Sequence, residues 1–164
     1  MAVLDNETRA VQNPAFGAAV LAAFVSGFYE NDATKTGVPL PYLYVALPMI
    51  LHSDIYCLIR STRPSLRHLA EKFVSVEYAG TDLLLSLHQR AIQMRKLTSE
   101  CLGVMLATGL VDLNRSNARL VPRKVQALAD RPETPDQSEQ ARKLGGWFAE
   151  LSPFEIGSIL KVTF

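Results

Sequence analysis

The sequence predicts a mainly α-helical protein with one small β-hairpin. Apolar residues recur at helical spacing in most segments of the 164-residue chain. Hydrophobic residues make up 48% of it, which is enough for a packed core at this length. Apolar and polar residues alternate only briefly, in "LVDLN" and "ARLV" on either side of the polar turn "RSN". We therefore expect one α-rich domain over residues 1–164.

The first helix is expected from Asn13-Pro14 to about Tyr29. Asn can cap a helix, and Pro fits the first turn because its missing N–H would be unpaired there anyway. Large apolar side chains cover much of its circumference, and the glycines and alanines between them allow a neighbour to approach closely. These features predict a central helix, which the polar loop "ENDATKTG" then ends.

Three shorter helices should follow. Apolar residues in "PLPYLYVALPMIL" recur at helical spacing, and Pro48 is expected to bend or divide that segment. Ser53 is expected to cap a helix from Asp54 to about Arg60. Another helix begins near Pro64 and carries its apolar residues on one face, namely Leu66, Leu69, Ala70 and Phe73.

The middle of the chain has the element order of a winged-helix module. Helices are expected from about Thr81 to Arg95 and from Thr98 to Leu106, with Gly109 placed to end the second. The hairpin comes next, so residues 65–122 form a winged-helix-like unit flanked by packed helices. Residues 122–137, with their prolines and charges, are expected to be an exposed connection.

The C-terminal segment "LGGWFAELSPFEIGSILKVTF" is the most distinctive part of the sequence. Two adjacent glycines cost a helix about 1 kcal/mol each relative to Ala, which is tolerable where another backbone comes close. Ser152-Pro153 should cap and open a final helix. The apolar residues here either bind a partner protein or pack on the helix of residues 16–28. The candidate partner-binding residues are Trp147, Phe148, Phe154 and Ile159.

Charge and cysteine content limit the function classes. Seventeen basic and sixteen acidic residues give a net charge of +1, so no overall field attracts nucleic acid or an anionic membrane. Cys57 and Cys101 cannot form a disulfide framework and are expected to be buried thiols in a reducing cytoplasm. The uncharged stretches 10–29 and 36–53 are read as buried core helices and not as membrane spans.

Residue patterns indicate neither catalysis nor a cofactor. His52, Ser53 and Asp54 have the residue types of a catalytic triad, but adjacent residues cannot form its relay. The three histidines and two cysteines have no metal-ligand spacing, and no phosphate-binding glycine motif is present. We therefore expect no enzyme activity, metal or cofactor; a hydrolase using His52 and Asp54 is a distant alternative.

The hairpin is the candidate contact for nucleic acid or an acidic partner, through Arg115, Arg119, Arg123 and Lys124. In a DNA-reading winged helix, the preceding helix offers Arg, Lys, Asn or Gln to base edges. Here that helix, "TSECLGVMLATG", presents no such residue, and Glu100 would repel phosphate. A protein partner is therefore favoured, and contact with nucleic acid would be a non-specific one with the phosphate backbone.

Three segments together resemble a known family: "NPAFGAAVLAAFVSGFY", "LPMILHSD" and "LGGWFAELSPFEIGSILKV". They are similar to the middle component of bacterial three-component ABC-ATPase systems, over roughly residues 12–162. The resemblance implies a small non-enzymatic protein encoded with a Rad50- or SMC-like ATPase and an effector-like third component. Such systems are thought to act against phage or other mobile elements. The resemblance carries no catalytic residues with it.

The expected function is therefore an adaptor that links an ABC ATPase to an effector in the cytoplasm. The alternative is a winged-helix DNA-binding transcriptional regulator. That alternative predicts that duplex DNA is retarded at moderate salt and that Arg115→Ala combined with Arg119→Ala abolishes the shift.

Overall fold

The computed structural model describes residues 13–75, 79–123 and 135–164, and confirms a mainly helical fold with a small antiparallel sheet. The described helices are α2 (Pro14–Asn31), α3 (Tyr42–Leu51), α4 (Ser53–Ser61), α5 (Leu66–Ser75), α6 (Ala79–Gln93), α7 (Arg95–Ala107), α8 (Pro135–Ala149) and α9 (Pro153–Leu160). The described strands are β1 (Val38–Pro39), β2 (Val111–Asn114) and β3 (Arg119–Pro122).

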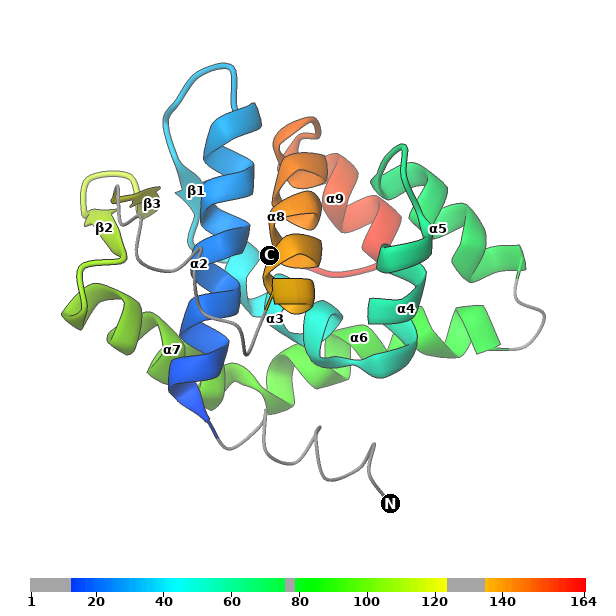
Figure 1. Cartoon of the computed structure of the whole chain (residues 1–164). Helices are drawn as coiled ribbons and strands as arrows, with labels where there is room; N and C mark the ends of the chain where they lie inside the picture. The colour runs from blue at the N-terminus through cyan, green and yellow to red at the C-terminus, as the bar shows by residue number, and fades with distance from the viewer. Residues whose placement is uncertain (1–12, 76–78, 124–134) are drawn as a thin grey trace.

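Helix α2 lies between the small sheet and α8 (Figure 1) and packs on α7 and α3 as well, so it has the role of a central helix that the sequence predicts. Its N-terminus is capped by Asn13, whose side-chain oxygen accepts hydrogen bonds from the Ala15 and Phe16 backbone N–H groups at 3.1 and 3.3 Å. Pro14 occupies the first turn. Half of the helix is buried, because α8 and α7 pack on it, together with α3 and the sheet.

Glycines let α2 and α8 touch through their backbones. A Cβ added at Gly27 would collide with the carbonyl oxygen of Arg142, and one at Gly145 would collide with the carbonyl oxygen of Phe24. Figure 1 shows the two helices side by side. The close approach that the paired glycines Gly145 and Gly146 predict is therefore confirmed. The C-terminal segment packs on the helix of residues 16–28, one of its two expected roles.

Aromatic rings fill the space where α2, α3 and α8 meet. Phe24 and Tyr42 both pack edge-to-face against Phe148, with ring centroids 5.3 and 5.5 Å apart. Phe28 contacts Tyr42 in the same way at 5.9 Å. Phe24 and Phe148 are fully buried and Tyr42 is nearly so, and edge-to-face pairs of this kind add to the stability given by burial alone.

The apolar segment of residues 42–61 divides at His52 and not at Pro48, which lies inside α3. Helices α3 and α4 meet at 93°. His52 caps α4, because its extended backbone allows the ring nitrogen Nδ1 to accept from the Asp54 N–H at 3.2 Å. The expectation that Ser53 is the cap was wrong; it is the first residue of the helix. No single helix in the described residues is long and apolar enough to cross a membrane, and α3 with α4 passes that test only as a bent pair.

The expected hairpin is present, but it belongs to a sheet of three strands in the order β1-β3-β2. Val38 and Pro39 of β1 pair with Leu120 and Arg119 of β3. Strand β1 lies outside residues 65–122, and so does α2, on which α7 packs. The hairpin thus depends on elements from elsewhere in the chain, and the winged-helix resemblance is not confirmed.

Substitution of the contact glycine tests the backbone packing of α2 on α8. Gly27→Ala should lower the free energy of unfolding by about 1–3 kcal/mol, the usual cost of forcing extra atoms into a packed interior. Gly103→Ala is the matched control, because a Cβ there meets nothing within 4 Å on helix α7. It should raise the free energy of unfolding by about 0.5–1 kcal/mol. Urea unfolding measures the free energy of unfolding of both variants. An equal change in the two would contradict the close approach of α2 and α8.

Candidate interaction surfaces

The four expected partner-binding residues divide into two pairs by burial. Trp147 and Phe148 are 5% and 0% exposed and belong to the core, so they do not offer a surface in this structure. Phe154 is 86% exposed at the start of α9, and Ile159 is partly exposed on the same helix. Only Phe154 and Ile159 can therefore be reached by a partner. The sequence could not separate the pairs, since all four residues are large and apolar.

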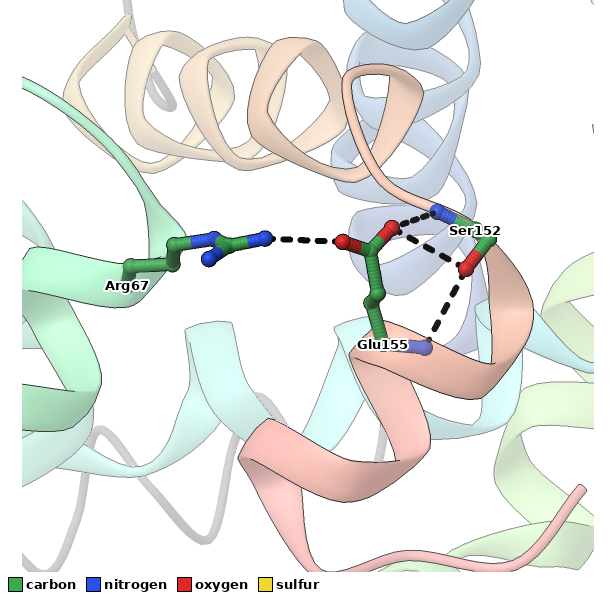
Figure 2. A network of polar contacts seen from close by, with 3 residues as sticks. All are labelled: Arg67, Ser152 and Glu155. Atoms are coloured by element: carbon green, nitrogen blue, oxygen red, sulfur yellow. Dashed lines mark hydrogen bonds and ion pairs between the residues drawn. The ribbon is translucent and has the colours of Figure 1, made fainter.

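A capping box opens α9, which presents Phe154, and one ion pair joins this helix to α5 (Figure 2). The Glu155 carboxylate accepts from the Ser152 backbone N–H at 2.9 Å, while the Ser152 hydroxyl caps the Glu155 N–H at 3.3 Å. This capping box confirms the predicted helix start at Ser152-Pro153. Arg67 of α5 donates to the other carboxylate oxygen at 2.7 Å. Hydrogen bonds from Ser152 and the charge of Arg67 hold the pKa of Glu155 below its ordinary value.

Two of the hairpin arginines already have partners within the chain. Arg119 donates from Nη1 to the Gly37 carbonyl at 2.7 Å and to the Thr36 hydroxyl at 3.1 Å. Arg123 forms an ion pair with Asp112 across the hairpin, with Nε 2.7 Å from the carboxylate. Arg115 lies exposed in the turn. Lys124 lies outside the described residues.

Nucleic acid would therefore compete with contacts inside the protein. The Arg119 side chain joins the hairpin to the loop before β1, and moving it to a phosphate would break both bonds. Among the described hairpin arginines, only Arg115 has no ion pair or side-chain hydrogen bond. One exposed arginine supplies little of the backbone affinity that non-specific binding needs. The DNA-binding alternative stays a prediction.

Helix α7 starts at Arg95, earlier than the expected Thr98. Thr98 is therefore not the first residue of the helix; it is buried and its hydroxyl donates to the Met94 carbonyl at 3.0 Å. Outward positions include Lys96 and Glu100, which pair with each other at 3.9 Å. Because α7 starts three residues earlier than expected, it carries two exposed basic residues, Arg95 and Lys96, that the expected helix lacked.

The two cysteines differ in environment. Cys101 is buried against α2, as expected, and burial together with the Glu100 charge raises the pKa of its thiol to about 11. The thiol therefore stays protonated at neutral pH and is a poor nucleophile. Cys57 on α4 is exposed, which corrects the expectation that both thiols are buried.

An apolar groove of about 410 Å³ lies between α3, α6 and residues 162–164, and it was not foreseen from the sequence. Its lining residues are Leu40, Pro41, Tyr44, Val45, His88, Ala91, Ile92, Arg95, Val162, Thr163 and Phe164. Ile92 at its edge is 61% exposed, and Leu85, two turns earlier on α6, is 64% exposed. The signal in the sequence that could have indicated this surface is the spacing of seven residues between Leu85 and Ile92, because this spacing places both on one face of a helix.

The described residues contain no group of three or more His, Cys, Asp and Glu placed to hold a metal ion. His52 is 8% exposed and serves as the cap of α4, and Asp54 contacts it through the backbone N–H.

No curated protein and no solved structure matches the chain.

The sequence model of the family "ABC-three component (ABC-3C) system Middle Component 3" matches residues 1–164. The chain belongs to this family. The resemblance found in the three sequence segments is therefore confirmed. A middle component belongs to a system of several proteins, so partner proteins are expected for it.

Three features distinguish the surface of this middle component: the exposed Phe154 on α9, the apolar groove beside α6, and the exposed Arg115 in the hairpin turn. Phe154 and the groove are apolar. Large exposed apolar residues gathered on a soluble protein commonly mark protein–protein contacts. Among the hairpin arginines that the structure describes, Arg115 is the one whose charge has no partner within the chain.

Two hairpin arginines can be compared: Arg119 makes hydrogen bonds within the chain, and Arg115 is exposed without such partners in the part of the chain that the structure describes. Arg119→Ala should lower the free energy of unfolding of the middle component by roughly 1–2 kcal/mol, because it removes the charged donor of two hydrogen bonds. Arg115→Ala is the matched control and should change it by less than about 0.5 kcal/mol. Thermal and urea unfolding measure both. Equal stability of the two variants would contradict the role of Arg119 in holding the hairpin.

Acid should weaken the loop between α2 and β1. Burial raises the pKa of Asp32, but hydrogen bonds from Thr34, Thr36 and Gly37 outweigh it and hold the pKa below its ordinary value. A lowered pKa in the folded state stabilises the protein above the unfolded pKa of about 4, and this stabilisation is lost as the pH falls through the folded value.

We therefore expect the free energy of unfolding to fall more steeply between about pH 5 and pH 2 in the wild type than in Asp32→Asn. Urea unfolding at a series of pH values measures the two slopes. Glu155→Gln is the comparison variant. It also removes a carboxylate whose pKa is lowered in the folded protein, but one that lies on α9 and not in this loop. Parallel slopes for wild type and Asp32→Asn would contradict the role of Asp32.

Proposed function

We propose that this middle component is a non-enzymatic adaptor that joins an ABC ATPase to an effector protein in the cytoplasm. The match of the family model to the whole of residues 1–164 carries the proposal. The exposed apolar features, on α9 and beside α6, support it because an adaptor needs contact surfaces for other proteins.

The mechanism would be coupling between two binding events. An ATPase changes shape with its nucleotide, and an adaptor that binds one shape better than the other shifts the population of that shape. If the effector binds the same adaptor, the two affinities are linked and each partner changes the affinity for the other. A protein with a rigid core is suited to this role, since displacement at one surface is then transmitted to another.

The biological setting that we propose is defence against phage or other mobile elements. It follows from the character of the three-component systems that the family resemblance implies. Loss of the gene should then remove protection to the same extent as loss of the ATPase gene. Plaque counts on cells carrying the complete system and each deletion compare the two.

Co-expression with the two proteins encoded alongside tests the adaptor role directly. With an affinity tag on the middle component, we expect the ATPase and the third component to be retained together after gel filtration. When the middle component is omitted and the tag is moved to the ATPase, the third component should no longer be retained. Purification of the middle component as a lone monomer in the presence of both proteins would overturn the proposal.

A further inference from the structure

The apolar groove beside α6 has the chemistry of a docking site for a partner helix. Its lining includes the buried residues Val45 and Val162 and the half-buried Leu40, together with Ile92 and Phe164, which are 61% and 45% exposed. Isolated exposed apolar residues are common, but here several of them border one hollow. Their exposure to water is unfavourable until another molecule covers them.

The exposed apolar surface continues beyond the groove along α6. Leu85 precedes Ile92 by seven residues and lies on the same face of the helix, with His88 exposed between them. Seven residues of α-helix span roughly 10 Å, or two turns. An occupant that covers both residues must therefore be elongated, and a second helix meets this stripe with side chains at positions i, i+4 and i+7.

Among the residues that line the groove, one arginine carries a charge. Arg95 lines it at the junction of α6 and α7, and no acidic residue is among the lining residues. Arg95 is exposed and makes no ion pair within the part of the chain that the structure describes, whereas its neighbour Lys96 is paired with Glu100. A segment that fills the groove with apolar side chains would thus gain from a carboxylate opposite Arg95.

We propose that this groove binds an amphipathic helix of another protein of the same three-component system, with an apolar stripe over Leu85 and Ile92 and an acidic residue against Arg95. The inference rests on the proposed adaptor function, which supplies the partner proteins. It adds which surface of the middle component binds and what the bound segment must look like.

The test uses the full-length proteins, with the middle component titrated against the ATPase and against the third component, each purified separately. Ile92→Asp places a charge in the apolar contact and should weaken binding of one of them by roughly 10- to 30-fold. Arg95→Glu should weaken the same complex by about 3- to 10-fold, and more at low than at high salt.

Matched controls lie on other faces. Leu106→Asp makes the same kind of apolar-to-acidic change on α7, and Arg63→Glu reverses an exposed charge between α4 and α5. Both should leave that complex within about twofold of wild type, the range usual for residues outside a contact. Thermal unfolding of each variant confirms that all four substituted proteins fold.

The outcomes separate the two proposals. If wild type binds neither protein, the adaptor function fails, and the occupant assigned to the groove fails with it. If wild type binds but Ile92→Asp binds equally well, or if Leu106→Asp weakens binding as much as Ile92→Asp does, the groove proposal alone is overturned. The wild type could instead form a concentration-dependent dimer that Ile92→Asp abolishes. In that case the groove binds a second copy of the chain, and the groove proposal is overturned. Restoration of Arg95→Glu binding by an acidic-to-basic change in the partner helix would support it most directly.

Discussion

The backbone contact between α2 and α8 is the constraint on which the rest of the structure depends. Two helices normally pack with axes 8–10 Å apart because side chains stand between them. At Gly27 and Gly145 no side chain intervenes, and each glycine faces a carbonyl oxygen of the other helix. The backbones can then approach closely enough for Phe24 and Phe148 to meet edge-to-face, and for Tyr42 of α3 to complete the layer.

The same contact fixes where α8 presents its polar residues. Lys143, one turn from Gly146, donates to the Ile59 carbonyl at the end of α4 at 2.8 Å, with its ammonium 5.2 Å from the centre of the Trp147 ring. Burial, with the charge of Arg63, lowers the pKa of Lys143. A cation near the C-terminal end of a helix is stabilised by the helix dipole, so Lys143 remains favourable there. Trp147 is therefore part of the packed core, with the Lys143 ammonium over its ring.

Much of the fold could be predicted because the decisive signals were local. The Asn13 cap, the Ser152 capping box and the paired glycines each act over a few residues, so the sequence alone displays them. Strand β1 could not be found, because it has two residues, one of them Pro39, and exists only through pairing with β3. The same limit applies to Thr98, which was expected at the start of a helix and is buried within α7. Its burial depends on how α7 packs, and that depends on α2.

The candidate surfaces show a related limit. A stripe such as Leu85 and Ile92 looks identical in sequence whether a neighbouring helix covers it or not. Trp147 and Phe148 appeared suited to a partner and are covered, while Leu85 and Ile92 appeared ordinary and are exposed. Only the position of the neighbouring elements decides between these outcomes.

For the adaptor function that we propose, the relative placement of the two apolar surfaces matters more than either surface alone. The groove is walled by α3 and α6, and Phe154 stands on α9, which the Arg67–Glu155 pair holds to α5. Helix α3 also packs on α2 and α8, whose backbone contact leaves little room for adjustment. Closely packed interiors respond to displacement by transmitting it, because they have few voids to absorb it. A partner that shifts α6 or α3 would therefore act on a rigid unit that includes α8, and α9 follows α8 directly in the chain. This is the physical basis on which binding at one surface could change affinity at the other.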